Sequence, residues 1–385
     1  MGVNYLNDMK KIYADHAATT KLSSMALEAM MEFLRDDYKN PSTLYSDASI
    51  SRRAIVNARN RIAECIGAKP SEIIFTSGGT ESDNCAIKNI VFNKCNTRRT
   101  IITSQIEHHA ILNSCKIMEE LGYKVVYLPV DNYGVVSIDL LKREINDDTA
   151  IVSIMYANNE IGTIQPIREI AQIAHKHGAL FHTDAVQAIG HVNINVTELE
   201  IDMLSASAHK FNGPKGSGFL YLRDGVIMTP FISGGSQEHG LRAGTENVAG
   251  IVGMSVALRE NTEQIHRNSH YLFELETTLI KRLQSYNLDF IKNGSEEKIP
   301  GNISLSFANA EGEMILHRLD LKGIQIATGS ACDSKNTQLS HVVKAIGVPA
   351  KYAKGTIRIS FGMDNTCEDA IYIADQIAHI FVNRK

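Results

Sequence analysis

An acid and an amine follow two apolar runs in the middle of the chain. Asp184 and Gln187 come after the run at 179–181, and Lys210 comes after Met203-Leu204. A carboxylate beyond one strand and an amine beyond a later strand are what an enzyme needs to hold pyridoxal phosphate (PLP). The lysine forms a Schiff base with the aldehyde, and the carboxylate keeps the pyridine nitrogen protonated so that the ring accepts electrons. The alternative interpretation is a surface lysine in a glycine-rich loop.

The segment 75–84 reads Phe-Thr-Ser-Gly-Gly-Thr-Glu-Ser-Asp-Asn, which predicts a strand, a glycine turn and the start of a helix. Thr80 can cap that helix, with Asp83 as its partner in a capping box. The free amide protons and the helix dipole then favour an anion such as phosphate at the turn. A plain capped helix is the alternative. The segment is neither a Walker loop nor a dinucleotide fingerprint, because GK[ST] and G-x-G-x-x-G are absent.

Two adjacent histidines, His108 and His109, follow the predicted strand at 101–103. A flat imidazole there could stack on a cofactor ring and take part in proton transfer, although a lone histidine is more often structural. Neighbours in sequence point in different directions and cannot easily share one metal ion. Three further histidines lack a matching ligand set, so we expect no metal site: His175, His177 and His182.

Short apolar runs alternate with amphipathic stretches through the middle of the chain, which predicts an α/β domain with a mainly parallel sheet. The predicted strands are 73–76, 100–103, 125–128, 150–156, 179–182, 202–205 and 219–222, and the predicted helices are 82–92, 109–121, 137–144 and 167–177. A long helical pattern from about 248 to 286 leads into a smaller α+β region with strands at 301–307 and 356–360 and helices at 312–322 and 369–382. We therefore expect a large domain at 15–262 and a small one made of 1–14 and 263–385.

Composition excludes several classes of protein. The chain has 385 residues, 44% of them hydrophobic and 21% charged, and a formal net charge of −4. That charge gives no argument for binding nucleic acid or an anionic membrane. No secretory signal or membrane-spanning stretch is predicted. The six cysteines are scattered without a CxxC pair, which suits a reducing, cytoplasmic environment and argues against a disulfide framework.

Seven motifs in order along nearly the whole chain resemble the cysteine desulfurases of the NifS/IscS type, which belong to the aminotransferase class V group of PLP enzymes. They are the runs at 13–20 (YADHAATT), 40–42 (NPS), 77–84 (SGGTESDN), 158–162 (NNEIG), 182–187 (HTDAVQ), 242–247 (RAGTEN) and 329–332 (GSAC). The resemblance implies the fold type I of PLP-dependent transferases. It also implies a homodimer with sites at the interface.

The resemblance assigns a role to each residue of the cofactor site. Lys210 would carry the cofactor, Asp184 would pair with the pyridine nitrogen, and Gln187 would bind the phenolic oxygen. His108 would stack on the ring, and Asn158 would lie near the ring and the substrate. The phosphate would be held by the following residues of one subunit, with Thr245 reaching in from the other: Gly79, Thr80, Ser207 and His209.

The reactive thiol is predicted at Cys332, within the small, polar stretch Gly-Ser-Ala-Cys-Asp-Ser-Lys-Asn at 329–336. An accessible thiolate is a nucleophile, whereas Cys65, Cys85 and Cys115 are expected to be structural. Arg358 lies in an apolar strand pattern, where an ion pair is the ordinary role. The family uses this arginine as a fork for the substrate carboxylate.

The resemblance implies that L-cysteine is converted to L-alanine while its sulfur becomes a persulfide on Cys332. An acceptor protein of an iron–sulfur cluster or thiolation pathway would then take the sulfur. The chain departs from the family at Tyr45, Ala48 and Asp333, and a carboxylate beside the thiol disfavours the thiolate. A selenocysteine lyase, or a β-lyase for another cysteine derivative, is therefore an alternative on the same fold. A catalytically silent scaffold or regulator is the alternative from another class.

Overall fold

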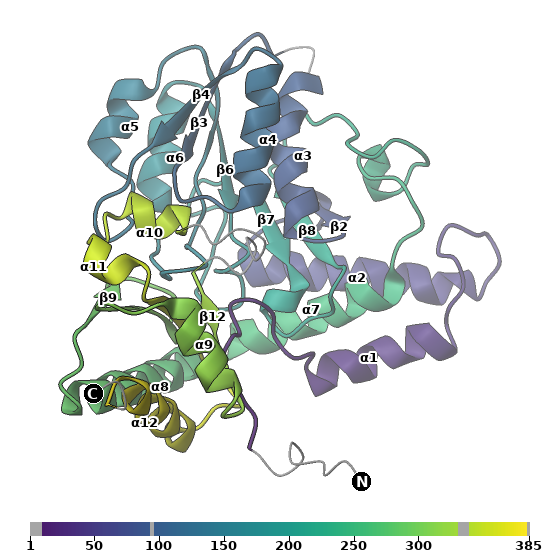
Figure 1. Cartoon of the computed structure of the whole chain (residues 1–385). Helices are drawn as coiled ribbons and strands as arrows, with labels where there is room; N and C mark the ends of the chain where they lie inside the picture. The colour runs from purple at the N-terminus through teal and green to yellow at the C-terminus, as the bar shows by residue number, and fades with distance from the viewer. Residues whose placement is uncertain (1–9, 93–95, 330–338, 383–385) are drawn as a thin grey trace.

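The computed structural model describes residues 10–92, 96–329 and 339–382 (Figure 1). A seven-stranded sheet forms the centre of the larger part, in the order β2-β8-β7-β6-β5-β3-β4. Five neighbouring strands run parallel: β3 (Thr100–Ser104), β4 (Lys124–Leu128), β5 (Thr149–Ser153), β6 (Leu180–Asp184) and β7 (Met203–Ser207). At the other edge, β8 (Gly218–Leu222) is antiparallel to both β7 and β2 (Ile73–Thr76). The predicted mainly parallel α/β sheet is thus confirmed.

Both faces of this sheet are buried, which explains why its strands are apolar throughout. Ile101 and Ile151 pack into one core together with α3 (Gly79–Phe92) and α4 (His109–Glu120). Their neighbours Ile102 and Val152 face the opposite core, since successive strand residues alternate between faces. The helices bordering that second core include α1 (Ser24–Arg35), α2 (Ala48–Ile66), α5 (Ile138–Glu144), α6 (Ile167–Lys176) and α7 (Val248–Glu263).

A separate core lies in the C-terminal part, at the lower left of Figure 1. Its antiparallel sheet has the order β12-β13-β10-β9, with β9 at Phe290–Asn293, β10 at Asn302–Phe307, β12 at Ala327–Thr328 and β13 at Thr356–Ser360. The helices of this part are α8 (Ile265–Ser285), α9 (Gly312–Asp320), α10 (His341–Ala345), α11 (Ala350–Ala353) and α12 (Cys367–Val382). Ile12 of β1 (Ile12–Tyr13), which pairs with β11 (Ile324–Gln325), belongs to the same core. These two sets of cores support the division into two domains, whose boundaries remain a prediction.

The sequence suggested one long helical pattern at 248–286, but the structure has two helices there. The pattern breaks at Gln264, whose φ of −115° lies outside the helical range and whose N–H bonds only to Asn261 O. The break separates α7, which packs in the large core, from α8, which packs in the small one. Two helices with different partners need not share an axis. None of the helices within the described ranges is long and apolar enough to span a membrane.

Candidate active site

Nine of the residues predicted from sequence line one cavity of about 290 Å³. The cavity lies where β6 and β7 end, which is where open α/β sheets bind ligands. The nine residues are Gly79, Thr80, His108, Asp184, Gln187, Ser207, His209, Lys210 and Arg358.

The predicted cofactor lysine sits in a short 3₁₀ turn, Ala208–Lys210, that directly follows β7. Its Nζ donates to the carbonyl oxygens of Ala17 at 2.6 Å and Ala18 at 2.9 Å. Gln187 Nε2 donates to the same Ala17 oxygen at 2.9 Å. The N-terminal motif therefore crosses the cavity and orients both the amine and the amide.

Asp184 is the last residue of β6 and is only 5% exposed. Its Oδ1 accepts a hydrogen bond from the backbone of Val186 at 2.9 Å. Burial raises the pKa of Asp184, while the charge of Lys210 acts in the opposite direction. A buried carboxylate balanced in this way needs a cationic partner, which a protonated ring nitrogen supplies.

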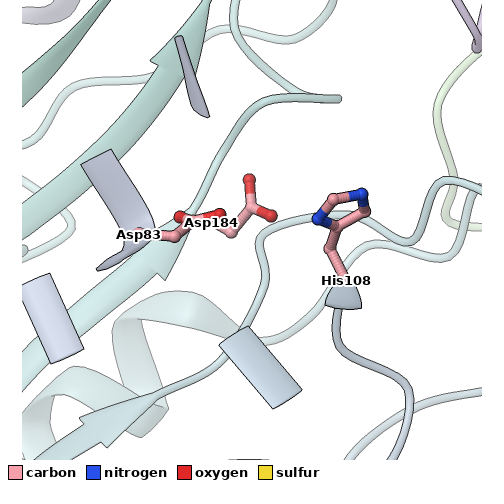
Figure 2. Close-up of side chains that lie close together, drawn as sticks. All are labelled: Asp83, His108 and Asp184. Atoms are coloured by element: carbon pink, nitrogen blue, oxygen red, sulfur yellow. The ribbon is translucent and has the colours of Figure 1, made fainter. Parts of the chain in front are cut away.

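His108 caps α4, and its Nδ1 accepts from the backbone of Ala110 at 3.2 Å. Because burial lowers the pKa of His108, the ring is neutral near pH 7 and carries its proton on Nε2. Figure 2 shows the imidazole turned toward the Asp184 carboxylate across the cavity.

The glycine turn after β2 allows a close approach of the backbone to its surroundings. Gly78 has φ +147°, and a Cβ on Gly79 would lie 2.4 Å from Val186 Cγ2. The hydroxyl of Ser207 lies beside this turn, because a Cβ on Gly78 would be 3.3 Å from Ser207 Oγ. Gly79 and Thr80 at the start of the 14-residue α3 line the cavity together with Ser207, and free amides at a helix start suit a phosphate.

The predicted capping box at this turn is wrong. The helix α3 already begins at Gly79, so Thr80 lies within its first turn. The amide of Ser77 is instead bound by Glu81 Oε2 at 2.8 Å. Asp83 points inward and is 1% exposed, a position that a local capping pattern cannot reveal.

Arg358 lies in the centre of β13 and is 4% exposed. Its Nη2 donates to Asp15 Oδ1 at 2.6 Å and its Nη1 to Asn159 O at 3.0 Å. Its Nε is buried without a hydrogen-bond partner among the described residues. An unpaired buried N–H is costly, so the cavity is prepared for an acceptor such as a carboxylate.

Two of the predicted site residues that the structure describes do not line the cavity. Asn158 is fully buried, and its amide binds Ile106 O at 2.9 Å and the backbone of Glu160 at 2.8 Å, so it shapes the wall of the cavity. Thr245 is exposed and does not line the cavity. Cys332 lies outside the described residues.

The sequence interpretation also missed several residues around the cavity. Asp15 and Ala17 belong to the motif at 13–20, which had been given no role although it contacts both Arg358 and Lys210. Glu160, next to Asn159, lines the cavity and accepts from Ser340 Oγ at 2.6 Å. Glu107 is completely buried beside His108. Sequence position could have pointed to both glutamates, because Glu160 lies in the motif at 158–162 and Glu107 directly precedes His108.

These features fit PLP. The amine of Lys210 suits its aldehyde, the buried Asp184 suits its ring nitrogen, and the glycine cradle at α3 suits its phosphate. Since all three lie along one cavity, the same ligand can reach them together.

Residues 12–372 match the model of the aminotransferase class-V family. A curated relative, cysteine desulfurase IscS of Dictyoglomus turgidum, is 48% identical over 96% of this chain and 94% of its own length. Cysteine desulfurase IscS of Methanosarcina thermophila is 46% identical over 98% of this chain and 94% of its own.

Solved structures agree with these relatives. A NifS-like protein superposes with a TM-score of 0.91 at 38% identity, covering 97% of this chain and all of its own. The structure of SspA in complex with cysteine superposes with a TM-score of 0.82 at 36% identity, covering 91% of this chain and 99% of its own.

Proposed function

Because the chain belongs to the aminotransferase class-V family and matches its cysteine desulfurases along nearly its whole length, we propose that it is a PLP-dependent cysteine desulfurase. L-cysteine and a protein thiol are converted to L-alanine and a protein persulfide, so the sulfur atom is transferred and no external oxidant is needed. The observation that carries the proposal is that the Lys210 amine, the Asp184 carboxylate and the Arg358 guanidinium line one cavity.

The residues of the cavity divide into those that hold the cofactor and those that hold the substrate. Bound PLP supplies an aldehyde that captures the substrate amine and a ring that withdraws electrons from the bonds around Cα. Asp184 holds a proton on the ring nitrogen, Gln187 binds the phenolic oxygen and His108 stacks on the ring. The phosphate is bound by Gly79, Thr80, Ser207 and His209.

Lys210 has two roles in this proposal. Its Nζ binds the cofactor, and after displacement by the substrate it is the base that removes the Cα proton. The carbonyls of Ala17 and Ala18 keep Nζ beside the cavity when it is released. His108, neutral with its proton on Nε2, is placed to return a proton during the later steps.

Arg358 binds the substrate carboxylate through the Nε that lacks a partner. Asn158 orients this end of the cavity, since it fixes the turn that carries Asn159 and Glu160. The substrate is thereby held with its amine toward Lys210 and its carboxylate toward β13.

Cys332 is the thiol that takes the sulfur. It lies three residues beyond Gly329, which lines the cavity, and three extended residues span at most about 11 Å. The distance is compatible with attack on a substrate held at Arg358. The persulfide is then passed to an acceptor protein, for iron–sulfur cluster assembly as the names of the relatives imply, or for thiolation.

The enzyme works as a homodimer in this proposal. Apolar side chains on α1 are exposed, including Met25 at 58% and Leu34 at 58%, and Leu44 in the following loop is 97% exposed. Large apolar side chains left this exposed on one helix and the loop after it would be covered at an interface between subunits. Exposed Thr245 then contributes to the phosphate site of the other subunit. We place the enzyme in the cytoplasm, where the four described cysteines, all free, would remain reduced.

Mass spectrometry after exposure to L-cysteine tests the function. We expect one added sulfur on the peptide containing Cys332, and alanine released in equal amount during the first turnover. Cys332→Ala should abolish the sulfur transfer, with Cys65→Ala as the matched control. Full cysteine turnover in Cys332→Ala would contradict the persulfide step.

A selenocysteine lyase is the second candidate, since Asp333 beside Cys332 disfavours the thiolate, whereas the substrate's selenol is more acidic than a thiol. Alanine release from the two substrates, measured side by side, decides between them. A catalytically silent scaffold would release alanine from neither substrate, whether or not it binds PLP.

A further inference from the structure

The carboxyl group of Asp83 lies against the ring-nitrogen acid Asp184 and has no part in the reaction described above. It comes from α3, lines the same cavity and is 1% exposed. One polar atom from each of Asp83, His108 and Asp184 lies within 4.8 Å of the other two. Figure 2 shows the three side chains lying close together. Asp83 Oδ1 is buried without a hydrogen-bond partner among the described residues.

Two carboxyl groups so close together and so deeply buried oppose each other's ionisation, which favours a proton on one of them. Burial and then the charge of Asp184 raise the pKa of Asp83 well above its usual value. The pKa of Asp184 is also raised by burial, but the positive charge of Lys210 opposes that rise. The proton of the pair therefore belongs on Asp83, and the negative charge on Asp184.

A chain of polar groups leads from the core to Asp83. Ser153 Oγ lies 2.9 Å from His182 Nδ1, and His182 Nε2 lies 3.0 Å from Ser205 Oγ. The Ser205 hydroxyl lies near enough to the Asp83 carboxyl group to lower its pKa, against the larger effects of burial and of Asp184. Burial lowers the pKa of His182 to about 3, so its ring is neutral, with one donor and one acceptor.

Oδ1 of Asp83 lies on the side of this chain, 3.8 Å from His182 Nε2, and has no hydrogen-bond partner among the described residues. A proton on the Asp83 carboxyl group turns it into a donor, and an oxygen of the Asp184 carboxylate lies within 4.8 Å of it. The other ionisable groups placed against Asp83 are Glu107, whose pKa burial raises to about 8, and the neutral rings of His108 and His182. None of these supplies a positive charge that would keep Asp83 ionised.

We propose that Asp83 is a neutral carboxylic acid that donates a hydrogen bond to the Asp184 carboxylate and thereby acts as a positioning residue for the cofactor's ring nitrogen. The inference rests on the proposed function, because it needs PLP with its nitrogen at Asp184. Asp83 does not touch the reacting atoms. It holds the Asp184 carboxylate in orientation and keeps its charge facing the ring.

Two substitutions of Asp83 distinguish the effect of its hydrogen-bond donor from the effect of a negative charge at this position. Asparagine reproduces the shape, the donor and the acceptor of a neutral acid, whereas leucine has the volume without either. A hydrogen bond to a charged group contributes about 1.5–3 kcal/mol, so Asp83→Leu should weaken PLP binding by roughly tenfold or more. Asp83→Leu should also shift the pH midpoint of the visible absorption of bound PLP. Asp83→Asn should restore both to near the values of the unmodified enzyme.

Two results of that experiment would overturn the proposal. If Asp83→Asn is as impaired as Asp83→Leu, the anionic charge is what matters. If Asp83→Leu matches the unmodified enzyme, Asp83 has no influence on the ring. Failure of the unmodified enzyme itself to bind PLP would instead contradict the proposed function, and the cofactor-free measurement below would still decide the state of Asp83.

Melting temperatures of the cofactor-free protein give a second readout. An acid whose folded pKa is raised holds a proton that the unfolded chain has lost, so stability declines as pH rises from about 4 toward the folded pKa. Asp83→Asn removes that decline, and its melting temperature relative to the unmodified protein should rise between pH 5 and pH 8. A constant difference would overturn the neutral assignment, as would one equivalent of divalent metal in the purified protein that is lost in Asp83→Asn.

Discussion

The guanidinium of Arg358 donates from Nη2 to Asp15 Oδ1 at 2.6 Å, joining two residues that are 343 positions apart in the sequence. The side chain of Arg358 is 5% exposed and that of Asp15 is 18% exposed. A buried guanidinium needs such a counter-charge, and the bond also fixes the plane of the fork. The Arg358 side chain is thereby held in the lining of the cavity.

Replacing Arg358 by lysine should therefore damage substrate binding even though the charge remains. Lysine cannot keep the contacts to Asp15 and Asn159 O while offering a third donor in a fixed plane. We expect KM for L-cysteine to rise by about tenfold or more, with a smaller change in kcat. Arg282→Lys, in an exposed pair with Asp375, is the matched control and should leave KM unchanged. Equal kinetics for the two variants would exclude Arg358 as the carboxylate site.

Lys210 is tested by chemical trapping. Borohydride should fix PLP to the peptide that contains Lys210 and bleach the visible absorption. Lys210→Ala should lose this adduct, while Lys215→Ala, an exposed lysine of the same glycine-rich segment, should keep it. Mass spectrometry of the reduced peptides reads out both variants. An adduct on another lysine in the otherwise intact enzyme would contradict the assignment.

The strands of the large sheet could be predicted because their covering on both faces makes them apolar runs. β2 and β13 have the predicted bounds, and β3 differs by a single residue. The predicted strand at 150–156 was too long, since β5 ends at Ser153 although Ile154, Met155 and Tyr156 remain buried. Burial alone does not distinguish a strand from the loop that follows it.

The site residues that belong to recognisable motifs could be predicted from the sequence. The contacts between residues far apart in the sequence could not. No local sequence pattern predicts that Ala17 O accepts hydrogen bonds from both Lys210 and Gln187. The donors lie 193 and 170 positions away in the sequence. For the same reason Asp83 was read as part of a helix cap, whereas its position in the core depends on β6 and β7. The helices α1 and α2 were also missed, and the exposed apolar residues of α1 blur its helical pattern.

The buried imidazole of His182 should make stability sensitive to acid. The pKa of His182 in the folded protein is lowered to about 3 from an ordinary 6.5. Between these two pH values the unfolded chain binds a proton at His182 and the folded protein does not. The contribution is fully present above pH 6.5 and is lost as the pH falls toward 3. His182→Asn should therefore reduce the slope of unfolding free energy against pH between 4 and 6, even if the variant is less stable overall.

The measurement is urea unfolding of the cofactor-free protein at several pH values in this range. His266→Gln, on the exposed surface of α8, is the matched control and should leave the slope unchanged. A slope that is the same for His182→Asn and the unmodified protein would mean that His182 already carries a proton when folded.

Glu160 ties together the two chain segments that flank Cys332. Its Oε2 accepts from Ser340 Oγ at 2.6 Å, and the same oxygen is 2.7 Å from where a Cβ on Gly329 would lie. Gly329 and Ser340, which border the stretch 330–339, therefore both lie beside the buried carboxylate of Glu160, which lines the cavity. Loosening either contact should impair the reach of Cys332 toward the substrate without affecting the cofactor.

We expect Glu160→Gln and Ser340→Ala to slow persulfide formation on Cys332 by about tenfold, since each removes a charge-assisted hydrogen bond. The spectral change of bound PLP on adding L-cysteine should keep its rate, because it reports a step that precedes sulfur transfer. Rapid quenching followed by mass spectrometry measures the first rate, and stopped-flow absorbance the second. Glu313→Gln, an exposed residue of α9, is the control. If both rates fall together, Glu160 acts on cofactor or substrate binding and does not serve Cys332.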